Sequence, residues 1–192
     1  SMTIREGGQL PFGDYGGSAV LPRREIEPDA VLAADQVLVG RNRTRQTYNA
    51  RIRELLGRDG PVPVAEDALV CLRNDRKRGL LNGSLWRVDA VRKPRKGLLR
   101  YGLAPADGEG TRRITASINP AYFDGTAEAL TTHERRRSDA FDFGYVLTVH
   151  KAQGSQWDDV ILFDESFAFR EHAARWLYTG ITRAAKRIRI VR

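Results

Sequence analysis

The stretch GYVLTVHKAQGSQWDDVILFDE, residues 144–165, decides the fold of this chain. It holds an apolar run at residues 145–147 and a second one at 160–163, separated by a polar segment. Short apolar runs bounded by polar turns are typical of strands buried in a parallel sheet. The stretch therefore predicts an α/β protein with two buried strands joined by a polar connection.

The polar connection carries groups that suit phosphates. Thr148 can cap a short helix that holds His150 and Lys151 and ends at Gly154. Donor side chains at the carboxyl end of a strand, followed by a glycine that lets backbone approach a ligand, are typical of anion and nucleotide sites in open α/β sheets. A polar turn of purely structural origin is the alternative.

A second segment, WLYTGITRAAKR at residues 176–187, is needed to interpret the first. In order and spacing, the pair resembles motifs V and VI of superfamily 1 helicases. The run TVHKAQGSQWDDVIL is most similar to the branch typified by RecD, the exonuclease V alpha subunit, and by Dda-type phage helicases. Residues 34–57 and 68–88 resemble, in the same branch, the strand and helix before an inserted β-domain and the start of that insert.

The resemblance implies a domain organisation. We expect a RecA-like parallel sheet domain, helicase domain 2A, built from residues 34–60 and 139–192. An SH3-like antiparallel β-barrel, part of domain 2B, would be inserted at 61–138. Residues 1–33 are rich in Gly, Pro and mixed charge, so we expect them to wrap the surface or to be partly mobile.

The local pattern agrees with an inserted barrel. Turn signals at Asn82-Gly83 and Asp107-Gly108 lie between expected strands near residues 68–73, 84–92, 97–103 and 111–117. An amphipathic helix precedes them; its apolar face holds Tyr48, Ile52, Leu55 and Leu56, and Gly57 ends it. After them we expect a helix over residues 169–183 and a final strand over 187–191.

The resemblance also assigns roles to residues. Arg183 would be the arginine finger that stabilises charge on the transferred phosphoryl group; an arginine offsetting the dipole at a helix end is the alternative. ATP would also contact Gly154, Ser155 and Gln156, and Gln156 stands where many relatives have glutamate. Single-stranded DNA would be bound by Thr148, His150, Lys151, Arg41 and Asn42. For Arg41 and Asn42 a solvated loop is equally expected.

One expected part of a helicase is missing from the sequence. No G-x-x-x-x-G-K-[ST] phosphate-binding loop is present, and no strand ending in paired acidic residues or motif IV arginine precedes Gln36. Ser1-Met2 reads as a cloning scar. We therefore expect a carboxy-terminal helicase fragment whose domains 1A and 1B are absent. ATP and Mg²⁺ would serve the parent protein, and the fragment alone would bind neither and be inactive.

The composition is typical of a protein that binds polyanions. The formal net charge is +8 and the pI is about 10.0. The single cysteine, Cys71, lies in an apolar alternation and should pack in a core, so we expect a reducing, cytoplasmic location. Apolar runs of membrane-span length are absent from the sequence, and no membrane association is expected. The RecD-like branch implies 5′ to 3′ movement in replication, repair or recombination. A stand-alone nucleic-acid-binding module and a non-catalytic adaptor are the alternative functions.

Overall fold

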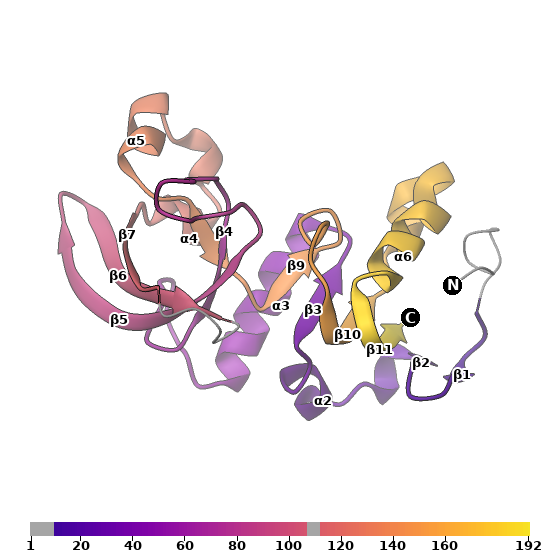
Figure 1. Ribbon diagram of the computed structural model, residues 1–192. Helices are drawn as coiled ribbons and strands as arrows, with labels where there is room; N and C mark the ends of the chain where they lie inside the picture. Colours follow the sequence, from indigo (N-terminus) through magenta and orange to yellow (C-terminus); the bar gives the residue numbers. More distant parts are fainter. Residues whose placement is uncertain (1–9, 107–111) are drawn as a thin grey trace. The chain divides into compact units, whose positions relative to one another are not determined.

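The computed structural model describes residues 10–106 and 112–192 (Figure 1). Contacts divide the chain into two compact units. The first unit contains the chain up to residue 52 together with residues 146–192, and the second contains residues 53–145. The chain thus leaves the first unit and later returns to it. The expected turn at Asp107-Gly108 lies outside the described residues.

A mixed, largely parallel sheet, sheet A, forms the centre of the first unit. Every strand pair in it is parallel except β1 with β2. In spatial order the strands are β1 (Gly13–Asp14), β2 (Ala19–Leu21), β11 (Ala184–Val191), β10 (Trp157–Phe163), β3 (Gln36–Val39) and β9 (Val146–Thr148). The central strand β10 is buried from Asp159 to Phe163, as expected for a strand covered on both faces.

Helices cover both faces of sheet A. Successive strand residues point to opposite faces. Leu162 lies against Gly180 of α6 (Ala173–Ile181), while Phe163 meets Tyr48 of α3 (Asn42–Leu55) edge to face at 4.8 Å. The two helices therefore lie on opposite faces. The remaining helices of this unit are η1 (Arg23–Glu25), α2 (Pro28–Leu32) and η3 (Ser166–His172).

Several local expectations for the first unit need correction. The segment after Thr148 forms consecutive turns instead of a short helix. The helix expected over 169–183 is divided, because Arg170, within η3 and shortly before α6 begins at Ala173, has the non-helical values φ 46° and ψ −121°. Leu55 and Leu56, expected on the packed face of α3, are exposed. Within 1–33, Ala19–Leu21 joins the sheet as β2 beside β11. The sequence did not indicate this strand, because three residues are too few to show a periodic pattern.

The second unit is built on an antiparallel sheet, sheet B. Its strands, in spatial order, are β7 (Ile114–Ile118), β6 (Leu98–Pro105), β5 (Leu85–Arg95), β4 (Ala68–Cys71) and β8 (Phe141–Phe143). Three short helices follow β7 in the sequence: α4 (Ala121–Asp124), η2 (Ala127–Ala129) and α5 (Thr132–Arg137). The expected closed barrel is not formed by strand pairing among the described residues. One isolated bridge, Ile118 with Asp139, links the β7 edge to the segment before β8.

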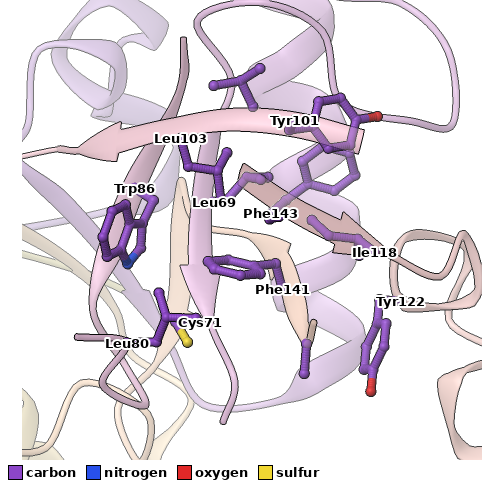
Figure 2. Packing of buried hydrophobic residues seen from close by; sticks show 13 residues of the cluster. Leu69, Cys71, Leu80, Trp86, Tyr101, Leu103, Ile118, Tyr122, Phe141 and Phe143 are labelled. Atoms are coloured by element: carbon purple, nitrogen blue, oxygen red, sulfur yellow. The ribbon is translucent and has the colours of Figure 1, made fainter. Parts of the chain in front are cut away.

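Aromatic and aliphatic side chains from all five strands of sheet B form one core (Figure 2). Trp86 is buried there, and its indole nitrogen donates to the Ser84 hydroxyl at 2.9 Å. Cys71 is also buried, and burial raises the pKa of its thiol. Both residues are therefore core residues, which confirms the prediction made for Cys71 from the alternation of its segment.

A buried carboxylate ties together the two ends of the second unit. Asp67 is fully buried and pairs with Arg53, at the start of the unit, at 3.2 Å. The hydroxyl of Tyr145, at the end of the unit, donates to Asp67 at 2.6 Å. Burial, followed by this bond to a carboxylate, raises the pKa of Tyr145 to about 12. Because β8 also pairs with β4, sheet B extends beyond the expected insert of 61–138.

None of the helices in residues 10–106 and 112–192 has the length and apolar character needed to cross a membrane.

Candidate nucleotide and nucleic-acid site

The two edges of sheet A separate the candidate residues into two groups. Strands β3, β10 and β9 are in register, so Gly40, Asp164 and Val149 follow them at the same, carboxyl edge. Trp157 and Ala184 pair at the start of β10 and β11, which is the opposite, amino edge. The connection 149–156 passes from one edge to the other. It therefore brings DNA candidates and nucleotide candidates to different ends of the sheet.

Arg183 lies at the amino edge, in the turn between α6 and β11. Its Nη1 donates to the Ser155 carbonyl oxygen at 3.0 Å, which joins motif VI to motif V. Its Nε donates to the Thr179 carbonyl at 3.2 Å, and Nη2 donates to the Thr182 hydroxyl at 3.1 Å. The Thr179 contact alone would fit an arginine that offsets a helix dipole. The Ser155 contact is a tertiary contact that such a role does not require.

The charge of Arg183 is not neutralised by these contacts. All three acceptors are uncharged oxygens. Within the described parts of the chain, Arg183 forms no ion pair with a carboxylate. A half-buried guanidinium held by neutral acceptors keeps its positive charge available for an anion.

Gln156 and Gly154 flank Ser155, the residue whose carbonyl oxygen accepts from Arg183. The Gln156 side-chain nitrogen donates to the Thr182 carbonyl at 3.2 Å, which leaves its side-chain oxygen as an acceptor. Gly154 is exposed and has φ +90°, a conformation that side chains disfavour. A Cβ at Gly154 would meet no atom within 4 Å, so the backbone here is open to a ligand.

The carboxyl edge presents two of the three motif V candidates for DNA binding. His150 and Lys151 are exposed. Thr148 is buried, and its hydroxyl accepts from the backbone N–H of Lys151 at 3.3 Å. Thr148 thus caps a turn where the sequence predicted that it would cap a short helix, and its hydroxyl is occupied within the chain.

Glu165 is a residue of this edge that the sequence reasoning missed. Its carboxylate is buried and accepts from the backbone N–H groups of Gly40 and Arg41 at 2.8 and 2.9 Å. The Thr44 hydroxyl donates to it at 2.7 Å, and the Arg41 guanidinium pairs with it at 2.6 Å. Burial raises the pKa of Glu165, but the bonds from Thr44, Arg41 and Gly40 outweigh it and hold that pKa below its usual value. The Arg41 guanidinium is therefore paired with a carboxylate, while Asn42 is exposed at the first position of α3. The signal for this site is the acidic pair directly after the β10 run.

A hollow of about 330 Å³ lies beside His150 on the α6 side of the sheet. Phe169 stacks on Trp176 with ring centroids 5.1 Å apart, and the His150 ring lies 5.7 Å from Phe169. The polar and basic residues that line the hollow are His150, Gln153, His172, Arg175 and Thr179. Rings beside cationic groups are the combination that binds bases and phosphates of single strands.

No metal cluster is apparent in this part of the molecule. Among the described residues, no group of three or more His, Cys, Asp or Glu side chains is placed to hold a metal ion.

Comparison of sequences identifies the carboxy-terminal segment. Residues 143–191 match the family described as UvrD-like helicase C-terminal domain. No curated protein matches the chain. The family match covers the two segments that resemble motifs V and VI, and it confirms the resemblance of this part of the chain to the C-terminal part of superfamily 1 helicases. The RecD-like branch stays a prediction.

Comparison of structures points to the same fold. The chain is similar to unliganded Pif1 from Bacteroides sp (TM-score 0.51, 14% identity, 88% of this chain and 43% of that one). It is also similar to Pif1 helicase from Candida albicans (TM-score 0.52, 12% identity, 95% and 47%). A third similar chain comes from a study of forked dsDNA unwinding by two coordinating Pif1 helicases (TM-score 0.51, 16% identity, 88% and 40%). The chain spans less than half the length of each.

Proposed function

We propose that this chain is the carboxy-terminal part of an ATP-dependent DNA helicase that translocates on single-stranded DNA, 5′ to 3′, and unwinds duplex. The observation that carries the proposal is the contact between Arg183 and the Ser155 carbonyl at 3.0 Å. It joins the two helicase motifs at one edge of sheet A. A sequence match alone would not require the motifs to meet.

In this proposal Arg183 acts as the arginine finger. Among the described residues its guanidinium bonds to uncharged oxygens, so its charge can stabilise the oxygens of a transferred phosphoryl group. The open backbone at Gly154 and Ser155 would lie along the nucleotide, and the free side-chain oxygen of Gln156 could accept from a ribose hydroxyl. ATP and Mg²⁺ would be held chiefly by a phosphate-binding loop that the printed sequence lacks, in domains 1A and 1B.

Single-stranded DNA would pass along the carboxyl edge. His150 and Lys151 are exposed there, beside a hollow that contains Phe169 and Arg175. We place Arg41 and Asn42 at the margin of this path, because Glu165 already binds the Arg41 side chain. The buried Thr148 would support the path by shaping the turn.

Sheet B would be the SH3-like part of domain 2B, inserted into domain 2A. Support comes from the nested order of the two units and from the Asp139 N–H, which donates to the Ser117 carbonyl at 2.7 Å and links the two edges of the sheet. The limits 53–145 replace 61–138 in this proposal. A RecD-like branch, a cytoplasmic location and a role in replication, repair or recombination are part of the same proposal.

The test requires a protein that joins this chain to a domain with the phosphate-binding loop. Arg183→Ala should lower ATP turnover by roughly 10³-fold or more, the scale of arginine fingers, and leave single-strand affinity without nucleotide nearly unchanged. His150→Ala should lower DNA stimulation of the ATPase and unwinding while DNA-independent hydrolysis changes little. Arg136→Ala, an exposed arginine on α5, serves as the control.

Two results would overturn the assignment. If Arg183→Ala weakens DNA binding and spares hydrolysis, Arg183 is a DNA ligand or a structural arginine. If the coding region upstream contains no phosphate-binding loop, the second candidate, a nucleic-acid-binding module without ATPase activity, is favoured by the net charge of +8.

A further inference from the structure

The hairpin of β5 and β6 extends beyond its neighbours in sheet B. Strand β4 pairs with β5 only at Leu85–Arg87, so β5 has β6 as its one strand partner beyond Arg87 in sheet B. Strand β7 accompanies β6 to Leu99, and the hairpin is two-stranded only at its tip beyond that residue. Residues 91–97 are all exposed, and Val91 keeps 59% of its surface in solvent. We call residues 91–100 the basic ribbon. Leu99, at the base of the ribbon, packs against the core of the sheet. Residues 91–97 are exposed, so packing does not explain this part of the hairpin.

The charge of the basic ribbon is all of one sign. It contains Arg92, Lys93, Arg95, Lys96 and Arg100, and no acidic residue. In the described parts of the chain these five form no ion pair, whereas Arg87 pairs with Glu66 and Arg113 with Asp89 elsewhere in the sheet. Compensating carboxylates are thus available on the sheet and are not used on the ribbon.

Two features of the ribbon oppose its own stability. Arg92 and Arg100 are direct cross-strand partners, and like charges directly opposite each other are destabilising. At the tip, Lys96 has φ 53° and Gly97 has φ 75°, the backbone of a two-residue turn that prefers Asn, Asp or Gly at its first position. A cation stands at both places where a neutral residue would be more stable. Both features are explained if the ribbon meets a polyanion.

We propose that the basic ribbon binds the phosphate backbone of duplex DNA, without sequence preference. A two-stranded β-ribbon fits the width of the major groove of B-DNA, and guanidinium groups on it can reach the flanking phosphates. The ribbon has no aromatic side chain. Single-strand sites rely on aromatic rings for stacking, so the ribbon suits a duplex, unlike the hollow beside His150.

The experiment measures binding of the 192-residue chain to a blunt-ended duplex of about two helical turns, by fluorescence anisotropy at several KCl concentrations. The ribbon variant replaces four cations with glutamine: Arg92→Gln, Lys93→Gln, Arg95→Gln and Arg100→Gln. Lys96 is kept so that the turn is unchanged. The matched control removes four exposed cations elsewhere in the second unit: Arg76→Gln, Lys77→Gln, Arg136→Gln and Arg137→Gln.

The ribbon variant should lose at least tenfold in duplex affinity, and its slope of log K against log salt should fall by about 0.9 for each lost phosphate contact. The control should keep most of its affinity. Equal losses in both variants would mean diffuse attraction by net charge and would overturn the proposal. If the ribbon variant lost affinity only for single-stranded DNA of the same length, and not for the duplex, the proposal would also be overturned.

Stability provides an independent readout. Because Arg92 and Arg100 repel each other, Arg92→Gln with Arg100→Gln should not lower the melting temperature. This double variant should still show a measurable decrease in duplex affinity. A folded pair variant with unchanged duplex affinity and salt slope would contradict the proposal. No nucleotide is used, so the outcome does not depend on the ATPase proposed for the parent protein.

Discussion

At the scale of single residues, Glu165 shows how one carboxylate organises the carboxyl edge of sheet A. It accepts from two backbone N–H groups and two side chains that lie more than a hundred residues away in sequence. A buried carboxylate is stable only when its oxygens are satisfied in this way. Glu165 thereby fixes the start of α3 and the position of Arg41. Its role is structural, and its ion pair occupies the Arg41 guanidinium.

We predict that Glu165→Gln lowers the free energy of unfolding of the first unit by about 2 kcal/mol at neutral pH. The folded-state pKa of Glu165 is lowered, so its charge stabilises the fold above the ordinary glutamate pKa of about 4.3. That contribution is lost as the pH falls through the folded-state pKa, and the two proteins should then converge. Urea titrations followed by circular dichroism across this range would measure it, with the exposed Glu128→Gln as control. A difference independent of pH would exclude the charge as its cause.

At the scale of elements, Gly180 allows α6 to pack closely against sheet A, because glycine has no side chain. A Cβ there would lie 2.8 Å from Leu162 Cδ2 and 3.3 Å from Val149 Cγ2. Glycine costs about 1 kcal/mol relative to alanine inside a helix. The packing explains that cost, because α6 approaches Leu162 and Val149 closely at this position. Arg183 follows α6 directly, so the same packing positions the candidate finger.

We predict that Gly180→Ala lowers the melting temperature although alanine is the better helix former. Overpacking of a core costs about 1–3 kcal/mol, which exceeds the gain in helix propensity, and the contacted Leu162 is fully buried. Combining Gly180→Ala with Leu162→Val should recover part of the loss, because the shorter side chain makes room. A double-mutant cycle by thermal unfolding measures this coupling. Additive effects of the two substitutions would show that the residues do not compete for space.

At the scale of the whole molecule, the chain order allows one unit to be nested within the other. Asn49 of α3 donates to the Val146 carbonyl and accepts from the Val146 N–H, both at 3.1 Å. The last part of the first unit before the second unit is therefore bonded to the residue at which the chain returns. Ends that lie this close can be joined by a short connection.

We predict that replacing residues 57–144 with a short Gly/Ser linker leaves a first unit that unfolds cooperatively. The side-chain bonds of Asn49 should make it depend strongly on that residue, so Asn49→Ala in the shortened protein should lower its melting temperature by several degrees. Thermal unfolding followed by circular dichroism checks both results. Loss of cooperative unfolding in the shortened protein would argue against an independent first unit.

Local patterns in the sequence determined much of this protein. The apolar runs around residues 145–147 and 160–163 predicted buried parallel strands, and alternation predicted the buried Cys71. These features depend on neighbours along the chain, where periodicity and burial are directly related. The segments at 144–165 and 176–187 carried the resemblance to helicase motifs V and VI, and residues 143–191 match the UvrD-like helicase C-terminal domain.

Only the tertiary structure decided where these parts meet. Strand order and register separate His150 from Arg183 at opposite edges of sheet A and bring Glu165 to Gly40 and Arg41. Among the described residues, the edge strands β7 and β8 of sheet B likewise do not pair with each other, so the sheet does not close into a barrel. Such contacts join residues far apart in sequence, and their geometry follows from how strands pair and helices pack. A local pattern specifies which residues are buried, but it does not specify their distant partners.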